Sequence, residues 1–238
     1  MKAIVYHGNK DIRLENVPEP VPGNSEVKIR VELCGICATD IEEYQYGPNF
    51  IVHDVPHPLT GKTLPIITGH ELTGTVVETA SDVTNVDIGE RVVIFGCISC
   101  LDCWWCRNDA QVQCQSAAFV GFGRDGGLAE YMTWPSSHVV SMPDSVSVEE
   151  SALAEPAAVA HHAVYRGSPS PNDFIAVLGV GPVGILVLQI AKSIGARVCA
   201  IDKRSGSLDL AKDLGADLTI NSGEKDVVQV LKDHSDGV

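Results

Sequence analysis

Five of the chain's eight cysteines fall within residues 96–114, which read GCISCLDCWWCRNDAQVQC. Four of them, Cys100, Cys103, Cys106 and Cys114, form the pattern C-x2-C-x2-C-x7-C. Four thiolates at this spacing can close a tetrahedral zinc site on a loop, and such a site leaves no coordination position for a substrate. The pattern therefore predicts a structural zinc site and a small lobe of the fold built around it.

Two alternatives concern these thiols. The N-terminus carries neither a long apolar segment nor a small-residue cleavage site, so we expect a cytoplasmic chain. Disulfides are disfavoured in a reducing cytosol, and pairing four closely spaced cysteines within one short lobe would strain the bridges. A zinc register that uses Cys97, Cys100, Cys103 and Cys106 is also compatible with the chemistry, although it lacks the longer step that closes the loop.

Charge and length restrict the class of partner. The net charge of −14 disfavours nucleic acid and anionic membrane, because both require a basic protein surface. No stretch approaches the ~18 apolar residues of a membrane span. The 238 residues are 45% hydrophobic, which is enough to bury the core of one large or two ordinary domains. We therefore expect an acidic enzyme or small-molecule binder without nucleic acid or membrane partners.

A second group of metal-ligating residue types is split between two segments. Cys37 lies in CGICATD, where a Gly-containing turn follows a predicted strand, and His70 and Glu71 lie in ITGHELTGTVVE. A thiolate, an imidazole and a carboxylate suit zinc, and three protein ligands keep one position open for a substrate. Each residue alone would more often be structural. Cys34 and Cys199 lie in strand-like segments, which favours buried, small-hydrophobe roles for both.

From residue 174 the pattern changes to a βαβ rhythm, with strands predicted at 174–178 and 197–201 and an apolar helix at 182–194. The turn between the first strand and the helix reads G-x-G-x-x-G. A dinucleotide fingerprint requires this motif to lie between a strand and a helix, as it does here. Glycines let the backbone approach a pyrophosphate at the helix N-terminus. An Asp at the end of the second strand can accept hydrogen bonds from ribose hydroxyls, which favours NAD over NADP. The predicted cofactor-binding residues are Gly179, Gly181, Pro182, Val183, Gly184, Asp202 and Arg204.

Together these features resemble the zinc-dependent medium-chain dehydrogenase/reductase family over essentially all 238 residues. CGICATD, GHELTGTVVE, the four-cysteine lobe and GVGPVG stand in the family's order. The segments EEYQYGPNF, PHPLTGKTLPIITGHE and ALAEPAAVAHHAVYR are similar to its (R,R)-butanediol and sorbitol dehydrogenase branch. In that branch a Glu replaces the second zinc cysteine of common alcohol dehydrogenases, and the matching residue is Glu155.

The resemblance implies one catalytic zinc, one structural zinc and NAD. Cys37 and His70 would hold the catalytic zinc, with Glu71 and Glu155 alternating as direct or water-mediated ligands, so that an alcohol oxygen binds a Lewis acid. Thr39 would pass the hydroxyl proton outward, and Asp40 would orient the zinc histidine. The implied reaction oxidises a secondary alcohol or vicinal diol, such as 2,3-butanediol, to a ketone; a sorbitol or polyol dehydrogenase is the neighbouring alternative.

The implied fold class is α/β plus mainly β. A GroES-like zinc-binding catalytic domain would occupy residues 1–150, and residues 151–238 would hold a helical connector and the N-terminal half of a Rossmann NAD-binding domain. Because only three of six Rossmann strands are readable, we expect this nucleotide domain to be truncated. Two other possibilities remain: a catalytically silent zinc-binding remnant, and a zinc-free quinone reductase, which the two cysteine-containing groups disfavour. The full-length form is expected to be a homo-oligomer.

The remaining predictions concern secondary structure. A connector helix is predicted at about 149–166 and a third helix of the nucleotide domain at 224–237. Alternating apolar residues predict strands in the first domain at 2–8, 26–34, 71–79, 91–96, 128–134 and 138–143.

Overall fold

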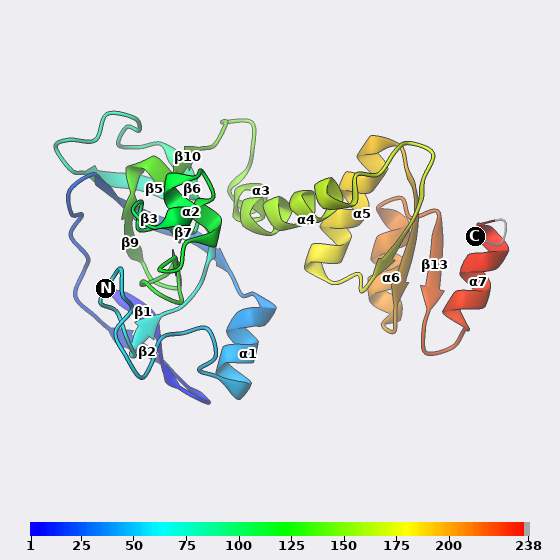
Figure 1. Ribbon diagram of the computed structural model, residues 1–238, viewed down its shortest axis with the longest axis horizontal. Coiled ribbons are helices and arrows are strands. Elements are labelled where there is room, and N and C mark those ends of the chain that lie inside the picture. Colours follow the sequence, from blue (N-terminus) through cyan, green and yellow to red (C-terminus); the bar gives the residue numbers. More distant parts are fainter. Residues whose placement is uncertain (236–238) are drawn as a thin grey trace. The chain divides into compact units, whose positions relative to one another are not determined.

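The computed structural model describes residues 1–235. The chain divides into two compact units, and the division falls after Glu155, inside a helix (Figure 1). Within residues 1–235, no helix has the length and apolar character needed to cross a bilayer.

The first unit is built mainly from β-strands. Its largest sheet is antiparallel and has the order β10-β6-β5-β3-β9, and a smaller sheet has the order β2-β1-β4. The hairpin of β7 and β8 encloses the four-cysteine segment. The strands are β1 (Lys2–Gly8), β2 (Asp11–Asn16), β3 (Glu26–Gly35), β4 (Ile66–Ile67), β5 (Glu71–Thr79), β6 (Arg91–Ile94), β7 (Cys97–Ile98), β8 (Ala118–Phe119), β9 (Tyr131–Pro135) and β10 (Val139–Ser141).

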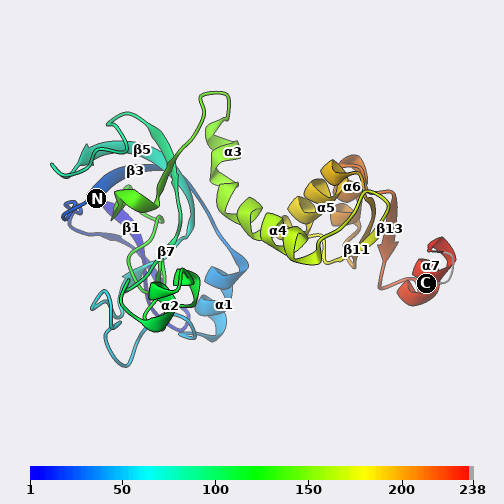
Figure 2. The same ribbon diagram turned by 45° about the horizontal axis from the view of Figure 1, so that its top comes forward.

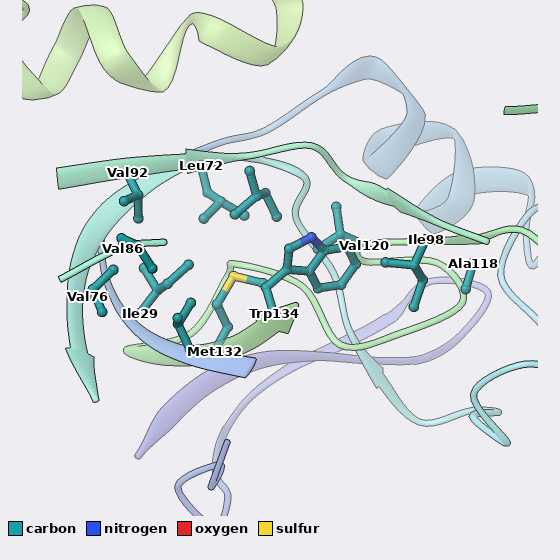
Figure 3. Packing of buried hydrophobic residues seen from close by; sticks show 12 residues of the cluster. Ile29, Leu72, Val76, Val86, Val92, Ile98, Ala118, Val120, Met132 and Trp134 are labelled. Atoms are coloured by element: carbon teal, nitrogen blue, oxygen red, sulfur yellow. The ribbon is translucent and has the colours of Figure 1, made fainter. Parts of the chain in front are cut away.

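The core of this unit lies against one face of the larger sheet. Figure 3 shows Trp134 between Met132 and Val120, with Ile29, Val76 and Val86 of the same cluster on the other side of Met132. Trp134 is 0% exposed, and its indole N–H donates to the carbonyl of Phe95 at 3.0 Å. A large buried aromatic whose polar atom is hydrogen-bonded fixes the position of the strands that carry the site.

Short helices follow or join these strands. They are α1 (Ala38–Tyr46), α2 (Trp104–Arg107), α3 (Val148–Ala152), α4 (Ala154–Gly167) and the 3₁₀ turns Gln111–Gln113 and Ser136–His138. The predicted connector at 149–166 is thus two helices, separated at Leu153. Helix α3 begins with a capping box, in which Ser147 and Glu150 satisfy each other's backbone N–H groups.

The second unit contains a three-stranded parallel sheet of order β11-β12-β13. Val198 and Ala200 of β12 pack with helices α5 and α6, whereas the alternate residues Cys199 and Ile201 pack with α7. Helices therefore cover both faces of the sheet, as in doubly wound folds (Figures 1 and 2). The elements are β11 (Phe174–Leu178), α5 (Pro182–Ile194), β12 (Arg197–Asp202), α6 (Ser205–Asp213), β13 (Leu218–Asn221) and α7 (Val227–His234).

Most predicted elements form, including the strands at 174–178 and 197–201 and the helix at 182–194. The strand predicted at 128–134 begins only at Tyr131, and the one predicted at 91–96 ends at Ile94. The helix predicted at 224–237 runs over Val227–His234, and positions 236 and 237 of that prediction lie outside the described residues.

One element next to a predicted ligand was not predicted from the sequence. Helix α1 begins at Ala38, with Cys37 as its N-cap residue. Asp40 stabilises this helix start because its carboxylate accepts the backbone N–H of Cys37 at 2.9 Å. The same contact fixes Cys37 at the helix end, close to the end of β3.

Candidate functional site

Three predicted ligands meet where β3, α1 and β5 come together. Ligand atoms of Cys37, His70 and Glu71 all lie within 4.8 Å of one another. Glu71 is the first residue of β5 and is paired with Gly35, the last residue of β3, which brings Cys37 alongside it. A Cβ on Gly35 would lie 2.4 Å from the Glu71 carboxylate, so the glycine leaves room for this position of the side chain. One sulfur, one nitrogen and one oxygen donor form a set that suits zinc.

The imidazole of His70 has polar groups on both sides. Its Nδ1 lies 3.8 Å from Oδ1 of Asp40, and these two buried atoms have no hydrogen-bond partner. Its Nε2 lies 3.4 Å from the hydroxyl oxygen of Thr39. Because Nδ1 is directed at Asp40, Nε2 is the nitrogen available to a metal, and Asp40 occupies the position of a carboxylate that orients a ligating imidazole.

Burial controls the acid–base properties of this group. Desolvation raises the pKa of the Cys37 thiol and that of the Asp40 carboxyl, while the charge of His70 acts in the opposite direction on Asp40. A buried thiol of this kind favours a bound cation, because coordination stabilises the thiolate that burial alone disfavours.

Glu155 behaves differently from the other predicted ligands. It lies in the first turn of α4 and is not one of the residues whose ligand atoms fall within 4.8 Å of one another. Burial raises the pKa of its carboxyl, His70 lowers it and Glu71 raises it further. The carboxylate is therefore within electrostatic reach of the cluster without being part of it, and its role as an alternating ligand stays a prediction.

The four-cysteine segment forms a second candidate metal site. The ligand atoms of Cys100, Cys103, Cys106 and Cys114 lie within 4.8 Å of one another, and Cys97 is outside this set. Sulfur separations of 3.5 Å (Cys103 to Cys106), 3.5 Å (Cys100 to Cys114) and 3.9 Å (Cys100 to Cys106) bracket the roughly 3.8 Å edge of a tetrahedron with Zn–S bonds of about 2.3 Å. All eight cysteines are free thiols. The geometry fits a closed zinc site.

Backbone amides support thiolates within this lobe. The N–H groups of Cys100 and Ser116 both donate to the sulfur of Cys114, each at 3.4 Å, and that of Cys103 donates to Cys100 at 3.3 Å. The amide of Cys106 is the main cause that lowers the pKa of Cys103 to about 6. Burial and the neighbouring thiols raise the pKa of Cys106 to about 11. Without a cation, the four thiolates therefore cannot all be charged at neutral pH.

A cavity of about 490 Å³ opens beside His70. Thr39 and His70 line one end of it, next to the cluster, and no other side chain that borders it is acidic or basic except His57. The side chains of Phe50, Val52, Phe119 and Phe122, called the aromatic wall below, form most of the rest. The ring of Phe122 lies 5.1 Å from that of His70 and 6.4 Å from that of Phe50.

Three backbone segments cross behind this cavity with only glycine between them. The N–H of Gly127 donates to the carbonyl of Gly69 at 2.9 Å. A Cβ on Gly121 would lie 2.9 Å from the nitrogen of Gly69, and one on Gly126 would lie 2.6 Å from the carbonyl oxygen of Thr68. Gly69 itself has φ of +93°, which favours glycine. This crossing places His70 beside Phe122.

In the second unit, the predicted glycine turn lies between β11 and α5. Gly179 has φ of +84°, and Gly181 is the N-cap of α5, with Pro182 at its start. A Cβ on Gly184 would clash with the carbonyl oxygen of Gly179, so this glycine allows the helix to approach the turn. Unpaired N–H groups at the start of α5 can bind an anion.

Asp202 lies at the end of β12, beside this turn. Its carboxylate accepts the N–H of Val180 at 3.0 Å and that of Lys203 at 2.8 Å, and the guanidinium of Arg204 contacts it at 3.2 Å. The bond from Arg204 is the main cause that lowers the pKa of Asp202. Arg204 is thus paired with Asp202, and this pairing leaves it less available to a ribose phosphate.

The structure therefore brings most of the predicted residues together in three places, two in the first unit and one in the second. Sequence reasoning did not identify the aromatic wall or His57. A signal was present in the sequence. The aromatic and apolar residues of GPNFIV lie between Cys37 and His70, and those of FVGFG follow the four-cysteine segment. However, only the contacts between distant segments show that they border one cavity.

Comparisons with known proteins agree with this geometry. Residues 23–144 match the alcohol dehydrogenase GroES-like domain, and residues 182–238 match the zinc-binding dehydrogenase family. The (R,R)-butanediol dehydrogenase of Bacillus subtilis (strain 168) is 38% identical over 100% of this chain and 68% of its own length. The chain belongs to the zinc-dependent medium-chain alcohol dehydrogenase family.

The chain is also similar to a second curated relative and to a solved structure. The sorbitol dehydrogenase of Bacillus subtilis (strain 168) is 33% identical over 98% of this chain and 64% of its own length. The crystal structure of 2R,3R-butanediol dehydrogenase from Bacillus subtilis has a TM-score of 0.92 and 36% identity, and the match covers 99% of this chain and 67% of that one. The predicted fold class, a GroES-like unit followed by a Rossmann-like parallel sheet, is confirmed.

Proposed function

We propose that this family member oxidises a small secondary alcohol or vicinal diol, such as 2,3-butanediol, to a ketone with NAD as hydride acceptor. The observation that carries the proposal is the cluster of Cys37, His70 and Glu71 beside a cavity whose lining, apart from Thr39, His57 and His70, is apolar. Three protein ligands leave room for a substrate oxygen, whereas the four-cysteine site is closed.

The chain's own residues have separate tasks in this reaction. Zinc at the cluster would supply a Lewis acid that lowers the pKa of an alcohol hydroxyl. Asp40 keeps the imidazole of His70 in orientation. The hydroxyl of Thr39, which lines the cavity 3.4 Å from His70, accepts the hydrogen bond of the substrate hydroxyl and provides the first position for its proton.

The second unit supplies the nucleotide contacts. The turn at Gly179 and Gly181 and the N-terminus of α5 bind the pyrophosphate, and Asp202 accepts hydrogen bonds from the adenosine ribose. Because Arg204 is already paired with Asp202, and because that carboxylate repels a 2′-phosphate, the pairing supports NAD rather than NADP.

The cavity lining supports a small alcohol over a polyol. Sorbitol would place several hydroxyls against Phe50, Val52, Phe119 and Phe122, where the side chains offer no partners. Each buried hydroxyl without a hydrogen bond costs about 1–3 kcal/mol. A diol that carries methyl groups would bury these groups there favourably. A polyol dehydrogenase is the second candidate because of the 33% identity to a sorbitol dehydrogenase.

The test is NADH formation by the purified chain with (R,R)-2,3-butanediol, NAD and zinc, with and without a chelator. Sorbitol and NADP are compared in parallel. We expect chelator-sensitive turnover that prefers the diol over sorbitol and NAD over NADP. Preference for sorbitol would establish the polyol alternative. Absence of turnover, from a chain that carries zinc at both sites, would instead identify a catalytically silent zinc-binding protein.

A further inference from the structure

His57 is a buried histidine that the mechanism above does not use. Its residue exposure is 8%, and it borders the cavity beside His70. It lies in the loop that joins α1 to β4, and the same loop carries Phe50 and Val52 of the aromatic wall. Buried polar atoms are normally hydrogen-bonded, so both nitrogens of this imidazole should have partners.

Both nitrogens of His57 have partners of opposite kinds. Nε2 lies 3.1 Å from the carbonyl oxygen of Ala117, which can only accept, so Nε2 carries the hydrogen. Nδ1 accepts the backbone N–H of Leu59 at 3.2 Å, so Nδ1 is bare. The ring is therefore neutral and in a single tautomer. Neither nitrogen is free to take a proton from a substrate or to bind a metal.

The partners of this ring connect two segments that are 60 residues apart in the sequence. Around it, the Thr60 hydroxyl donates to the carbonyl of Gly123, and Lys62 pairs with Asp125 at 2.7 Å. The ring also packs against Gly123, where a Cβ would lie 3.0 Å from its Cδ2. The turn at residues 57–62 is thereby fixed to the segment 117–125.

These two segments carry the two halves of the aromatic wall. Phe50 and Val52 come from the loop of His57, and Phe119 and Phe122 come from the segment that contains Ala117. The separation between the halves, and hence the width of the cavity, depends on the contacts that join the segments. Among them, the hydrogen bond from His57 to Ala117 lies within the cavity lining itself.

We propose that His57 is a positioning residue for substrate selectivity: its neutral imidazole fixes the two halves of the aromatic wall at the separation that fits the substituents of a small secondary alcohol. This inference rests on the proposed function for the identity of the substrate. The contact itself does not depend on the proposed function, because it involves only residues 57–62 and 117–123.

Two variants separate the two nitrogens. In His57→Gln the amide nitrogen can replace Nε2 as the donor to Ala117, whereas in His57→Asn the side-chain oxygen can replace Nδ1 as the acceptor from Leu59 but the donor no longer reaches Ala117. The readout is the ratio of kcat/KM for (R,R)-2,3-butanediol to that for 2-propanol, which has fewer carbons to place against the wall.

We expect His57→Asn to lower this ratio about fivefold, the effect of one hydrogen bond, through a higher KM for the diol. His57→Gln should restore the ratio of the unsubstituted protein. His162→Asn, an exposed histidine of α4, is the matched control and should leave the ratio as it is. An unchanged ratio in His57→Asn, or an equal loss for both alcohols, would overturn the proposal.

A second measurement does not depend on turnover. Long-range proton–nitrogen NMR spectra of the imidazoles should show His57 as the neutral Nε2–H tautomer, and the Leu59 amide should be protected from exchange. That protection should persist in His57→Asn and be lost in His57→Gln. If neither alcohol is oxidised, the proposed function fails, and the NMR result alone decides whether His57 makes the contact: a charged ring or an Nδ1–H tautomer would refute it.

Discussion

At the scale of single residues, the chain uses cysteine in two different settings. Cys37 shares its site with one imidazole and one carboxylate, and the site lies next to a cavity. Cys103 shares its site with three other thiols, which can fill all four positions around a zinc ion. The same ligand atom therefore belongs to an open site in one case and to a closed one in the other.

This difference predicts opposite results for two equivalent substitutions. Cys37→Ser should reduce alcohol oxidation by more than about 100-fold and change the urea midpoint little, because the fold does not depend on the open site. Cys103→Ser should chiefly lower the urea midpoint, because binding of a structural zinc contributes directly to folding. Turnover and urea denaturation of both variants check this, and equal unfolding of the two would contradict the division of roles.

At the scale of elements, the turn between β11 and α5 depends on the close approach of α5, at Gly184, to the backbone carbonyl of Gly179. Gly184→Ala would direct a methyl group at the carbonyl oxygen of Gly179. We expect a loss of roughly 1–3 kcal/mol in stability and weaker binding of NAD, because the helix must move away from the turn. Thermal denaturation and NAD titration measure these effects.

Gly206→Ala is the matched control for this substitution. Gly206 lies in α6, and a Cβ there would meet no atom within 4 Å. Alanine should stabilise the helix by about 0.4–1 kcal/mol. If both alanine variants had the same effect, the contact between Gly184 and Gly179 would not be the cause.

The elements also show what can be predicted from the sequence. The strands and helix of the βαβ segment follow from local periodicity and a glycine turn, and the four-cysteine ligands follow from their spacing. The assignment of Cys37, His70 and Glu71 needed the family resemblance in addition to residue type. Helix α1 was not predicted, because its residues ATDIEEYQY lack a clear apolar stripe and its start depends on the bond from Cys37 to Asp40. The contact of His57 with Ala117 joins residues 60 apart, and no local pattern indicates it.

At the scale of the whole molecule, the candidate zinc ligands and the candidate nucleotide-binding residues belong to different units. The ligands of both candidate zinc sites lie within residues 1–155, and the fingerprint residues lie in the second unit. Removal of zinc by a strong chelator should therefore increase hydrogen exchange in peptides of residues 97–119. Exchange in β11, β12 and β13 should stay as it was, because these strands belong to the second unit and carry no candidate zinc ligand. Mass spectrometry measures hydrogen exchange in the two regions separately. An equal increase in both regions would refute the assignment of the zinc sites to the first unit.

The glycine crossing behind the cavity has a consequence for anyone who would redesign the specificity of this protein. The side chains of Phe50 and Phe119 are largely exposed, so a library that varies them would retain most folded members. A β-carbon on Gly121 or Gly126 would clash with backbone atoms, and one on Gly69 would clash with the side chains of Leu128 and Cys34 and with the backbone nitrogen of Leu128. Laboratory evolution can therefore widen or narrow this cavity through its lining, whereas substitutions at these three glycines would displace the backbone that carries the lining.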